Sequence, residues 1–540
     1  MMNLLGRACN KAERDARIGM RRAAHAARHR HERGGRTLAD GHFLSIPERI
    51  RAIANSAPDR IALRDERGAL TYRAFAEAMA HTAGRLAAAG VGRDQVVAIC
   101  AFNSSAYVVA YFAAVGMGAV VAPLPQSATA DSLARMIRDC DARLVLVDDQ
   151  TRKLLAGAEL AVALHALDDI TVSNSDAADI AAFDWPTLAA SDRFNIIYSS
   201  GTTGTPKGIV QSHAMRDAHV RLGEACNYRA GGVTLLSTPL YSNTTLVSLV
   251  PTLALGGTAV LMRKFSVDGF LSLAQAQRAT HAMLVPIQYQ RLMASEQFAN
   301  YDLSAFEEKF CTSAPFAASL KQDVLARWPG GLTEYYGMTE GGGLCILAAH
   351  RHTDKLHTVG CPAPDTDMQV IDEDGRELPP GSVGEIVGHS ANSMSGYHNR
   401  PQATADATWT SPDGKRYVRT GDIGRFDDDG FLVLMDRKKD VIISGGFNIY
   451  PSDLEDVLRA HPSVVDAAVV GVPSAQWGET PVGFVVAADV AAAELLDFVN
   501  TRVGKSQRLA DLQLVDALPR SAIGKLLKRE LRDRWAAHQP

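Results

Sequence analysis

The sequence predicts an α/β protein: a large N-terminal lobe of two doubly wound sheets plus a β-barrel-like region, followed by a small mobile α+β C-terminal domain. From residue 46 onward, helical stretches alternate with short apolar runs, as in βα units of a parallel sheet. After about residue 355, short strands separated by Asp/Gly turns take over, and roughly the last hundred residues carry their own pattern. We expect a basic, disordered tail over residues 1–40, a large domain over 41–436 and a small domain over 437–540.

The N-terminal half of the large domain shows the alternation first. Helices are expected over 46–57 and 72–89, and the apolar runs VVAIC (96–100) and LVLV (144–147) are expected to be strands. The longest apolar run, residues 106–123, approaches the length of a membrane span, but Gly116 and Gly118 divide it. We therefore expect a buried helix followed by a buried strand, and no integral membrane segment.

A second series of strands and helices follows residue 208. The runs TLLSTPL (234–240), AVLM (259–262) and AMLVP (282–286) alternate with helical stretches over 247–255 and 270–280, which predicts the second sheet. The later turn sequences predict an antiparallel region: DEDG (372–375), PDG (412–414) and DDDG (427–430). The run DRKKD (436–440) then opens the small domain.

Composition narrows the class of partner. A chain of 540 residues with 46% hydrophobic and 21% charged residues and a net charge of −4 is ordinary for a globular enzyme, and it argues against nucleic acid as a partner. The seven cysteines include no CxxC pair, so neither a zinc site nor a disulfide framework is indicated. We expect small-molecule chemistry in a reducing compartment, the cytoplasm.

The N-terminal tail is strongly basic. The first 36 residues hold ten Lys/Arg against three acids and lack the apolar core of a secretory signal. A disordered tail and an upstream start codon, with Met20 as a later one, are the preferred interpretations. An organellar transit peptide is the third, although the acids and the scarcity of Ser count against it.

The stretch YSSGTTGTPKG (198–208) follows the apolar run FNII (194–197). A glycine-rich loop after a strand can point successive backbone N–H groups toward one position, which makes an anion-binding site. Pro206 precedes Lys207 and Gly208 follows it, so the stretch is not a Walker loop. A surface linker is the alternative interpretation of the same residues.

Further motifs follow in order: YYGMTE (335–340), TGD (420–422), DRKKDVIISGGFNIYPSDLE (436–455) and PRSAIGK (519–525). Together they resemble the acyl-adenylate-forming superfamily of acyl-CoA synthetases, adenylation domains and beetle luciferases, over residues from about 45 to 535. The acyl-CoA or aryl-CoA synthetase branch is the most similar. The resemblance implies that a carboxylate attacks the α-phosphate of ATP to give acyl-AMP and pyrophosphate, after which a thiol displaces AMP.

The resemblance implies ATP, Mg²⁺ and coenzyme A as cofactors. Transfer at a highly charged phosphorus depends on fixed donors and cations. By resemblance, Lys207 adds charge to a loop that closes over the β- and γ-phosphates, formed by Ser199, Ser200, Gly201, Thr202, Thr203 and Gly204. The resemblance also assigns nucleotide contacts to Ser313, Ala314 and Pro315.

The other motifs divide the remaining roles. By resemblance, Tyr336 lies against adenine, Thr339 touches the α-phosphate and Glu340 holds Mg²⁺, a hard cation that prefers oxygen ligands. Asp422 accepts hydrogen bonds from the ribose hydroxyls, and Arg437 joins it.

The small domain carries the residues implied for domain alternation. Lys525 bridges carboxylate and phosphate oxygens during adenylation, and Lys439 is the hinge. Gly445 and Gly446, in SGGF (444–447), line a pantetheine tunnel where missing side chains leave room for a thiol arm.

The acid pocket is the least defined part. Tyr241, Ser242 and Asn243 occupy the place where many ligases have an aromatic residue followed by His, and no acid occurs from 241 to 255, which disfavours an amino-acid substrate. Three glycines, Gly341, Gly342 and Gly343, either remove bulk from the pocket floor, as suits an aryl or medium-chain acid, or only let the backbone turn.

The acceptor and the assembly stay open. Free CoA is the expected acceptor because SGGFNIYPSDLE resembles the CoA ligases, and no carrier domain is expected after residue 540. A carrier-protein phosphopantetheine, a luciferase-like oxygenase and a non-catalytic acyl- or nucleotide-binding protein are the alternatives. A homodimer is one possible assembly, and the sequence does not determine the oligomeric state.

Overall fold

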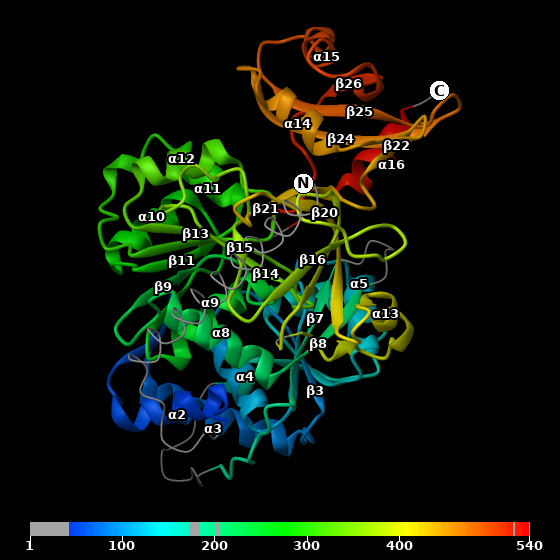
Figure 1. Cartoon of the computed structure of the whole chain (residues 1–540). Coiled ribbons are helices and arrows are strands. Elements are labelled where there is room, and N and C mark those ends of the chain that lie inside the picture. Colours follow the sequence, from blue (N-terminus) through cyan, green and yellow to red (C-terminus); the bar gives the residue numbers. More distant parts are fainter. Residues whose placement is uncertain (1–42, 172–182, 200–205, 392, 522–523, 539–540) are drawn as a thin grey trace, which may run out of the picture. The chain divides into compact units, whose positions relative to one another are not determined.

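The computed structural model describes residues 43–171, 183–199, 206–391, 393–521 and 524–538 (Figure 1). The predicted tail over 1–40 lies outside these residues. No helix of the described ranges is long and apolar enough to cross a membrane.

The first large sheet has seven strands, and its central strands are parallel. β8 pairs antiparallel with β7, and β18 pairs antiparallel with β8. In spatial order the strands are β18 (Gly396–Tyr397), β8 (Lys207–Ser212), β7 (Arg193–Ser199), β4 (Val120–Pro123), β3 (Val96–Cys100), β5 (Ala142–Val147) and β6 (Leu164–Ala166).

The apolar runs form strands of this sheet because helices cover both of its faces. In β3, Val97 and Ile99 belong to a core shared with α3 and α4, whereas Val96, Ala98 and Cys100 belong to a core shared with α5. The expected helix and strand over 106–123 are confirmed as α4 and β4. The helices of this part are α2 (Ile46–Ser56), α3 (Tyr72–Ala88), α4 (Ser105–Gly116), α5 (Ala130–Asp139), α6 (Asp149–Leu155) and α7 (Leu167–Thr171).

The second large sheet has nine strands and confirms the second series. Its strands from β13 to β1 are parallel, and antiparallel strands flank them at both edges. In spatial order they are β15 (Cys361–Pro362), β14 (Leu344–Ala348), β13 (Gly331–Gly337), β12 (Glu308–Cys311), β11 (His281–Leu284), β9 (Val233–Leu236), β10 (Thr258–Leu261), β1 (Ile61–Asp65) and β2 (Gly68–Thr71).

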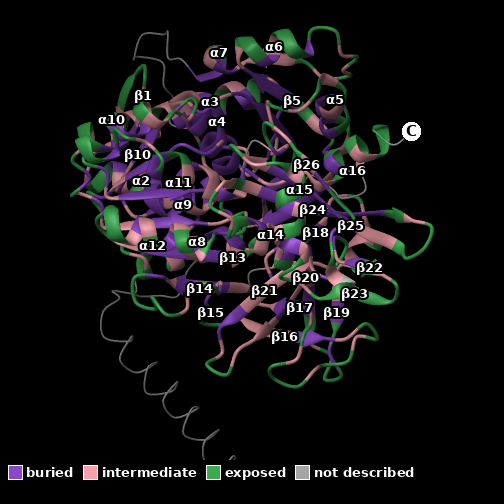
Figure 2. Ribbon diagram, turned by 90° about the horizontal axis from the view of Figure 1, so that it is seen from above, coloured by how far each residue is buried: buried purple, intermediate pink, exposed green. Residues whose placement is uncertain are grey.

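Five helices and a short 3₁₀ turn accompany the second sheet. Residues of α9 share a core with α3 and α4, so these three helices pack together between elements of the two sheets. Figure 2 shows buried residues concentrated along strands and inner helices, with exposed residues mostly in turns and on outer helix faces. The elements are α8 (His213–Ala225), α9 (Asn243–Ala254), α10 (Val267–Ala276), α11 (Pro286–Met293), α12 (Ala318–Arg327) and the 3₁₀ turn Phe298–Asn300.

The antiparallel region after residue 355 is confirmed, but as an open sheet. Its strands run in the order β16, β17, β20, β19, and β21 also pairs with β20. Among the described pairings none joins the outer strands to each other, so the expected barrel-like closure is not seen. The elements are β16 (Asp367–Ile371), β17 (Gly384–His389), β19 (Thr408–Thr410), β20 (Arg416–Phe426), β21 (Leu432–Arg437) and α13 (Pro401–Asp406).

The C-terminal hundred residues form a separate small sheet with helices, which appears orange to red in Figure 1. Its core includes Ile442, Leu454, Val469 and Leu495. Between β21 and β22 lies a turn that contains Lys439. The elements are β22 (Ile442–Ser444), β23 (Phe447–Ile449), α14 (Pro451–Arg459), β24 (Val464–Ser474), β25 (Gly478–Ala487), α15 (Ala492–Asn500), the 3₁₀ turn Lys505–Gln507, β26 (Asp511–Leu514) and α16 (Lys528–Ala537).

Candidate active site

Three segments that follow β9, β12 and β13, and that contain predicted site residues, lie at one edge of the second sheet. β9, β12 and β13 are parallel, so the residues that follow their carboxyl ends emerge at the same edge, where α/β proteins bind ligands. Thr244, in the first turn of α9, and Ser313, after β12, are joined there by a 2.6 Å hydrogen bond between their hydroxyls. Ser313 has φ +82°, a left-handed conformation that is strained for a serine and is typical of functional sites. Ala314 and Pro315 follow it directly.

A second cluster joins β13 to the antiparallel sheet. The Tyr336 hydroxyl donates to Asp422 Oδ2 at 2.8 Å, and Arg437 Nε lies 2.7 Å from Asp422 Oδ1. Asp422 is 7% exposed, and its burial raises the carboxyl pKa against the opposing charge of Arg437. Burial, together with the nearby Asp422 carboxylate, raises the pKa of Tyr336 well above its ordinary value. The structure thus brings together three residues that the motifs assigned to the nucleoside.

Lys525 lies close enough to this cluster to interact electrostatically with Asp422 and Arg437. Its ammonium pKa is lowered by burial and by the charges of Arg437 and Lys439, while Asp422 opposes the shift. The preceding Gly524 has φ +77° and packs so closely that a Cβ there would lie 2.7 Å from Ile287 Cγ2. The turn is held by Arg520 Nη1, which donates to the Gly524 carbonyl at 2.9 Å. A partly desolvated cation therefore faces the predicted nucleotide residues.

The glycine loop is bounded by paired strands. Ser199 ends β7 and Lys207 begins β8, and the two residues are register partners. Ser200, Gly201, Thr202, Thr203 and Gly204 lie outside the described residues. The Lys207 ammonium lies 5.0 Å from the centre of the Tyr397 ring. Lys207, which is predicted to bind phosphate, thus contacts the Tyr397 ring where the glycine loop ends.

Tyr397 is a candidate site residue that no sequence motif predicted. Its hydroxyl donates to Glu340 Oε1 at 2.8 Å, so one side chain contacts both Lys207 and the predicted metal ligand. The local sequence, GYHNRP (396–401), has only the features of a turn before a helix that begins with Pro. The contact with Glu340 joins residues 57 positions apart, which no local pattern could show.

Glu340 is suited to a magnesium ion that also binds phosphate. The residue is 8% exposed, and the described residues contain no group of three or more acids, His or Cys that could hold a metal by themselves. Mg²⁺ at nucleotide sites uses one or two carboxylates and takes its other ligands from phosphates and water. A single carboxylate here therefore fits the ion.

The Thr339–Glu340 backbone is fixed from two sides. Gln211 Nε2 donates to the Thr339 carbonyl at 2.6 Å, and the Met394 N–H donates to the Glu340 carbonyl at 2.8 Å. These bonds hold the turn after β13 against β8 and the segment before β18.

The start of α9 holds the predicted acid-pocket residues. Ser242 is the N-cap of the helix, and its hydroxyl accepts from the Thr244 N–H at 3.2 Å. The Asn243 side-chain oxygen accepts from Arg216 Nη1 at 2.8 Å. Burial raises the pKa of Tyr241. Ser242 thus has a structural role in addition to its predicted one.

The glycines after Glu340 pack tightly. Gly341 and Gly342 have φ of +75° and +84°, so both need the left-handed conformation. A Cβ on Gly342 would lie 2.7 Å from the Gly388 carbonyl oxygen, and one on Gly343 would lie 2.9 Å from Met368 Cε. These contacts favour the backbone-turn interpretation of the glycines.

The predicted pantetheine glycines lie in the turn between β22 and β23. Gly445 has φ +57° and Gly446 has φ +83°. The Gly445 N–H donates to the Trp477 carbonyl at 2.9 Å, and a Cβ on Gly445 would lie 2.9 Å from the Trp477 ring. A side chain at Gly445 would press on the indole unless Trp477, which is 51% exposed, moved away.

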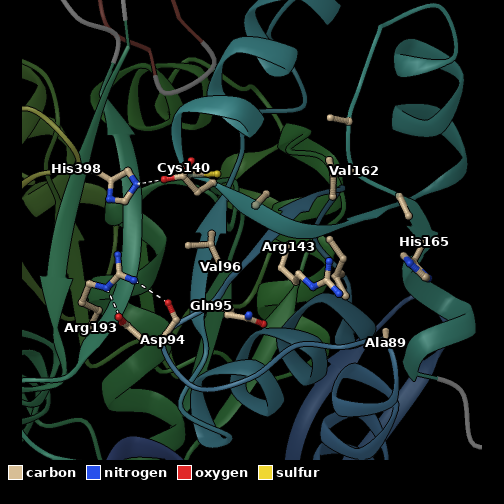
Figure 3. A pocket seen from close by; sticks show the side chains of 15 residues that line it. Ala89, Asp94, Gln95, Val96, Cys140, Arg143, Val162, His165, Arg193 and His398 are labelled. Carbon is tan, nitrogen blue, oxygen red and sulfur yellow. Dashed lines mark hydrogen bonds and ion pairs between the residues drawn. The ribbon is translucent and has the colours of Figure 1, made fainter.

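A hollow of about 490 Å³ elsewhere in the chain is not this site. It lies at the amino ends of β3 and β5, and Figure 3 shows Arg193 and Asp94 pointing toward one another. Arg193 Nε lies 2.6 Å from Asp94 Oδ1, and His398 Nε2 lies 3.4 Å from Asp141 Oδ2. None of the predicted site residues lines it. Asp94 pairs with Arg193, whereas Arg143, which also lines the hollow, donates from Nε to the Gly90 carbonyl at 3.1 Å.

Comparison with known proteins agrees with this geometry. A feruloyl-CoA synthase from Amycolatopsis sp is 34% identical over 494 residues, covering 89% of this chain and 97% of that protein. A fatty acid–[acyl-carrier-protein] ligase, ScoC from Streptomyces coeruleorubidus, is 31% identical, covering 89% and 95%. The crystal structure of ATP-bound MatB from Rhodopseudomonas palustris superposes with a TM-score of 0.82 at 28% identity, covering 91% and 99%.

Two protein families match the chain directly. The AMP-binding enzyme family matches residues 50–398, and the AMP-binding enzyme C-terminal domain matches residues 453–525. The matched ranges include the glycine loop, YYGMTE and the loop that ends at Lys525. The chain therefore belongs to the AMP-binding enzyme family, within the acyl-adenylate-forming superfamily.

Proposed function

We propose that this enzyme is an AMP-forming acid–CoA ligase that activates an aryl or medium-chain carboxylic acid. The observation that carries the proposal is the cluster of Tyr336, Asp422 and Arg437, with Lys525 close enough to interact electrostatically with the last two. It combines a nucleoside site with a cation on a separate domain, as the two-step reaction requires. The names of the relatives support a CoA-dependent ligase without fixing its acid.

In the first step, a carboxylate oxygen of the acid attacks the α-phosphorus of ATP, and pyrophosphate leaves. Lys525 neutralises the charge that builds on the carboxylate and phosphate oxygens, while Thr339 hydrogen-bonds the α-phosphate. Asp422 and Arg437 hold the ribose. Glu340 would hold Mg²⁺, which neutralises phosphate charge when it is bound.

In the second step, the sulfur of CoA attacks the acyl carbonyl and AMP leaves. We propose that the small domain, residues 437–540, rotates at Lys439 between the steps and brings Gly445 and Gly446 to the thiol path. The cytoplasm is the proposed location, because all six cysteines in the described part of the chain are unpaired.

A carrier-protein thiol is the second candidate acceptor, favoured by the relative named as a fatty acid–[acyl-carrier-protein] ligase. One experiment separates the two. Pyrophosphate release is measured over fatty, aryl and amino acids, and the acyl product is then collected with CoA or with a phosphopantetheinylated carrier protein. The proposal expects pyrophosphate with an aryl or medium-chain acid and transfer to CoA. Release only with amino acids, or transfer only to the carrier, would contradict it.

A further inference from the structure

Arg216, in α8, is a wholly buried cation whose recorded partners are all neutral. It is 0% exposed. Nε donates to Asn195 Oδ1 at 2.9 Å, and Nη1 donates to Asn243 Oδ1 at 2.8 Å. Nη2 donates to Gln211 Oε1, and His219 Nδ1 lies 3.3 Å from Nη1. No carboxylate lies within ion-pair distance among the residues that the structure describes. A buried charge of this kind is costly unless its hydrogen bonds are complete.

The guanidinium orients two buried amides. Asn195 in β7 and Gln211 in β8 are register partners on the two strands that flank the glycine loop, and both are 0% exposed. Because a guanidinium only donates, each amide must turn its oxygen toward Arg216. Asn195 Nδ2 then donates to Gln211 Oε1 at 2.9 Å. The Gln211 amide nitrogen is left facing away from Arg216, and it donates to the Thr339 carbonyl at 2.6 Å.

We propose that Arg216 and Gln211 are positioning residues for acyl-adenylate formation. Arg216 orients Gln211, and Gln211 holds the Thr339 carbonyl and therefore the Thr339–Glu340 pair. Through Asn243, the same guanidinium holds the start of α9, where the acid is expected to bind. The inference rests on the proposed function, which gives Thr339 and Glu340 their roles. Neither Arg216 nor Gln211 needs to touch the substrate.

Two substitutions of Gln211 separate positioning from stability. Gln211→Glu keeps the shape and supplies a counter-ion to Arg216, but the carboxylate cannot donate to Thr339. Gln211→Met also lacks the donor, and it leaves Arg216 one acceptor short. Thermal stability should therefore be higher in Gln211→Glu than in Gln211→Met, because the carboxylate compensates the buried charge of Arg216, whereas Met removes one of its acceptors. Gln275→Glu, at an exposed position of α10, is the matched control for the added charge.

The readout is ATP–pyrophosphate exchange below the melting temperature of each variant. Both Gln211 variants should lose kcat by about 10- to 100-fold, because misplaced reacting groups cost rate even when binding persists. KM for the acid should stay within about threefold, the pattern of an interaction that matters in the transition state. Gln275→Glu should behave as wild type.

Two results would overturn the positioning role of Gln211 and Arg216. If activity follows stability, so that Gln211→Glu is fully active and only Gln211→Met is impaired, the network is structural and the inference is wrong. A rise in KM with unchanged kcat would also overturn it. A wild-type enzyme that exchanges no pyrophosphate with any acid would instead overturn the proposed function, and the inference with it.

Discussion

Replacing Tyr397 by Phe tests the contact that links the phosphate lysine to the predicted metal ligand. The substitution removes the 2.8 Å bond to Glu340 Oε1 and keeps the ring under Lys207. Glu340 is only 8% exposed, so water cannot readily replace the hydroxyl. A hydrogen bond to a charged group contributes about 1.5–3 kcal/mol. At ~1.4 kcal/mol per tenfold, we expect kcat/KM for ATP to fall by about 10- to 150-fold.

The assay is pyrophosphate exchange at saturating acid, with ATP and Mg²⁺ varied separately. Tyr397→Leu also removes the ring, and should lose a further ~0.5–2 kcal/mol from the contact with Lys207. Tyr417→Phe is the matched control. It removes a hydroxyl that donates to Asp367 Oδ2 at 2.7 Å and that makes no contact with Glu340 or Lys207. A folded Tyr397→Phe enzyme whose kcat/KM equals that of Tyr417→Phe would refute the reasoning.

Three more predictions concern charge, rotation and pH. Lys525→Ala should slow adenylation by ~10² or more and spare thioester formation from supplied acyl-AMP. Because the pKa of Lys525 is lowered, the kcat/KM of the wild-type enzyme should begin to decline at a pH below the ordinary pKa of lysine. Equal loss in both half-reactions of Lys525→Ala would contradict this role. Lys439→Pro should retain acyl-AMP formation and lose transfer to CoA, because proline fixes φ at the proposed hinge; normal acyl-CoA synthesis would rule the hinge out. His281 is 0% exposed, and burial lowers its pKa to about 4. Below about pH 6.5, His281 binds a proton in the unfolded chain but stays neutral in the folded chain. The free energy of unfolding should therefore fall by up to ~3 kcal/mol between pH 6.5 and 4. Burial also lowers the pKa of His213 and His219, so in urea unfolding His281→Phe should reduce the fall without abolishing it. A pH profile identical to that of wild type would contradict the contribution of His281.

Much of the fold could be predicted because its signals are local. Gly116 and Gly118 divide the run 106–123 into α4 and β4, and the alternation of residues in β3 divides two cores. Closure of the antiparallel region could not be predicted in the same way. Turn residues between 372 and 430 determine that strands reverse, but whether the outer strands meet depends on stagger across the whole sheet.

The candidate site also contains residues with local sequence signals and residues defined only by long-range contacts. Lys207, Glu340, Asp422 and Lys525 each lie in a contiguous motif, so the sequence could nominate them, and their roles stay predictions. Tyr397 and Arg216 act through contacts between distant segments: 57 residues separate Tyr397 from Glu340, and 27 separate Arg216 from Asn243. A lone tyrosine or arginine in a sequence has no periodicity or spacing that reveals such a partner.

The three glycines after Glu340 limit where the acid specificity resides. Gly342 approaches the Gly388 carbonyl and Val418 so closely that a side chain there would have to displace the antiparallel sheet, whereas a side chain at Gly343 would have to displace the end of Met368. Their missing side chains are therefore explained by packing, and they need not create space for a substrate. We expect residues near the start of α9 to contribute to the choice of acid, because Tyr241 and Asn243 lie there and Arg216 donates to Asn243. Exchanging side chains at Tyr241 should consequently change acid preference, whereas enlarging Gly342 should reduce activity with every acid alike.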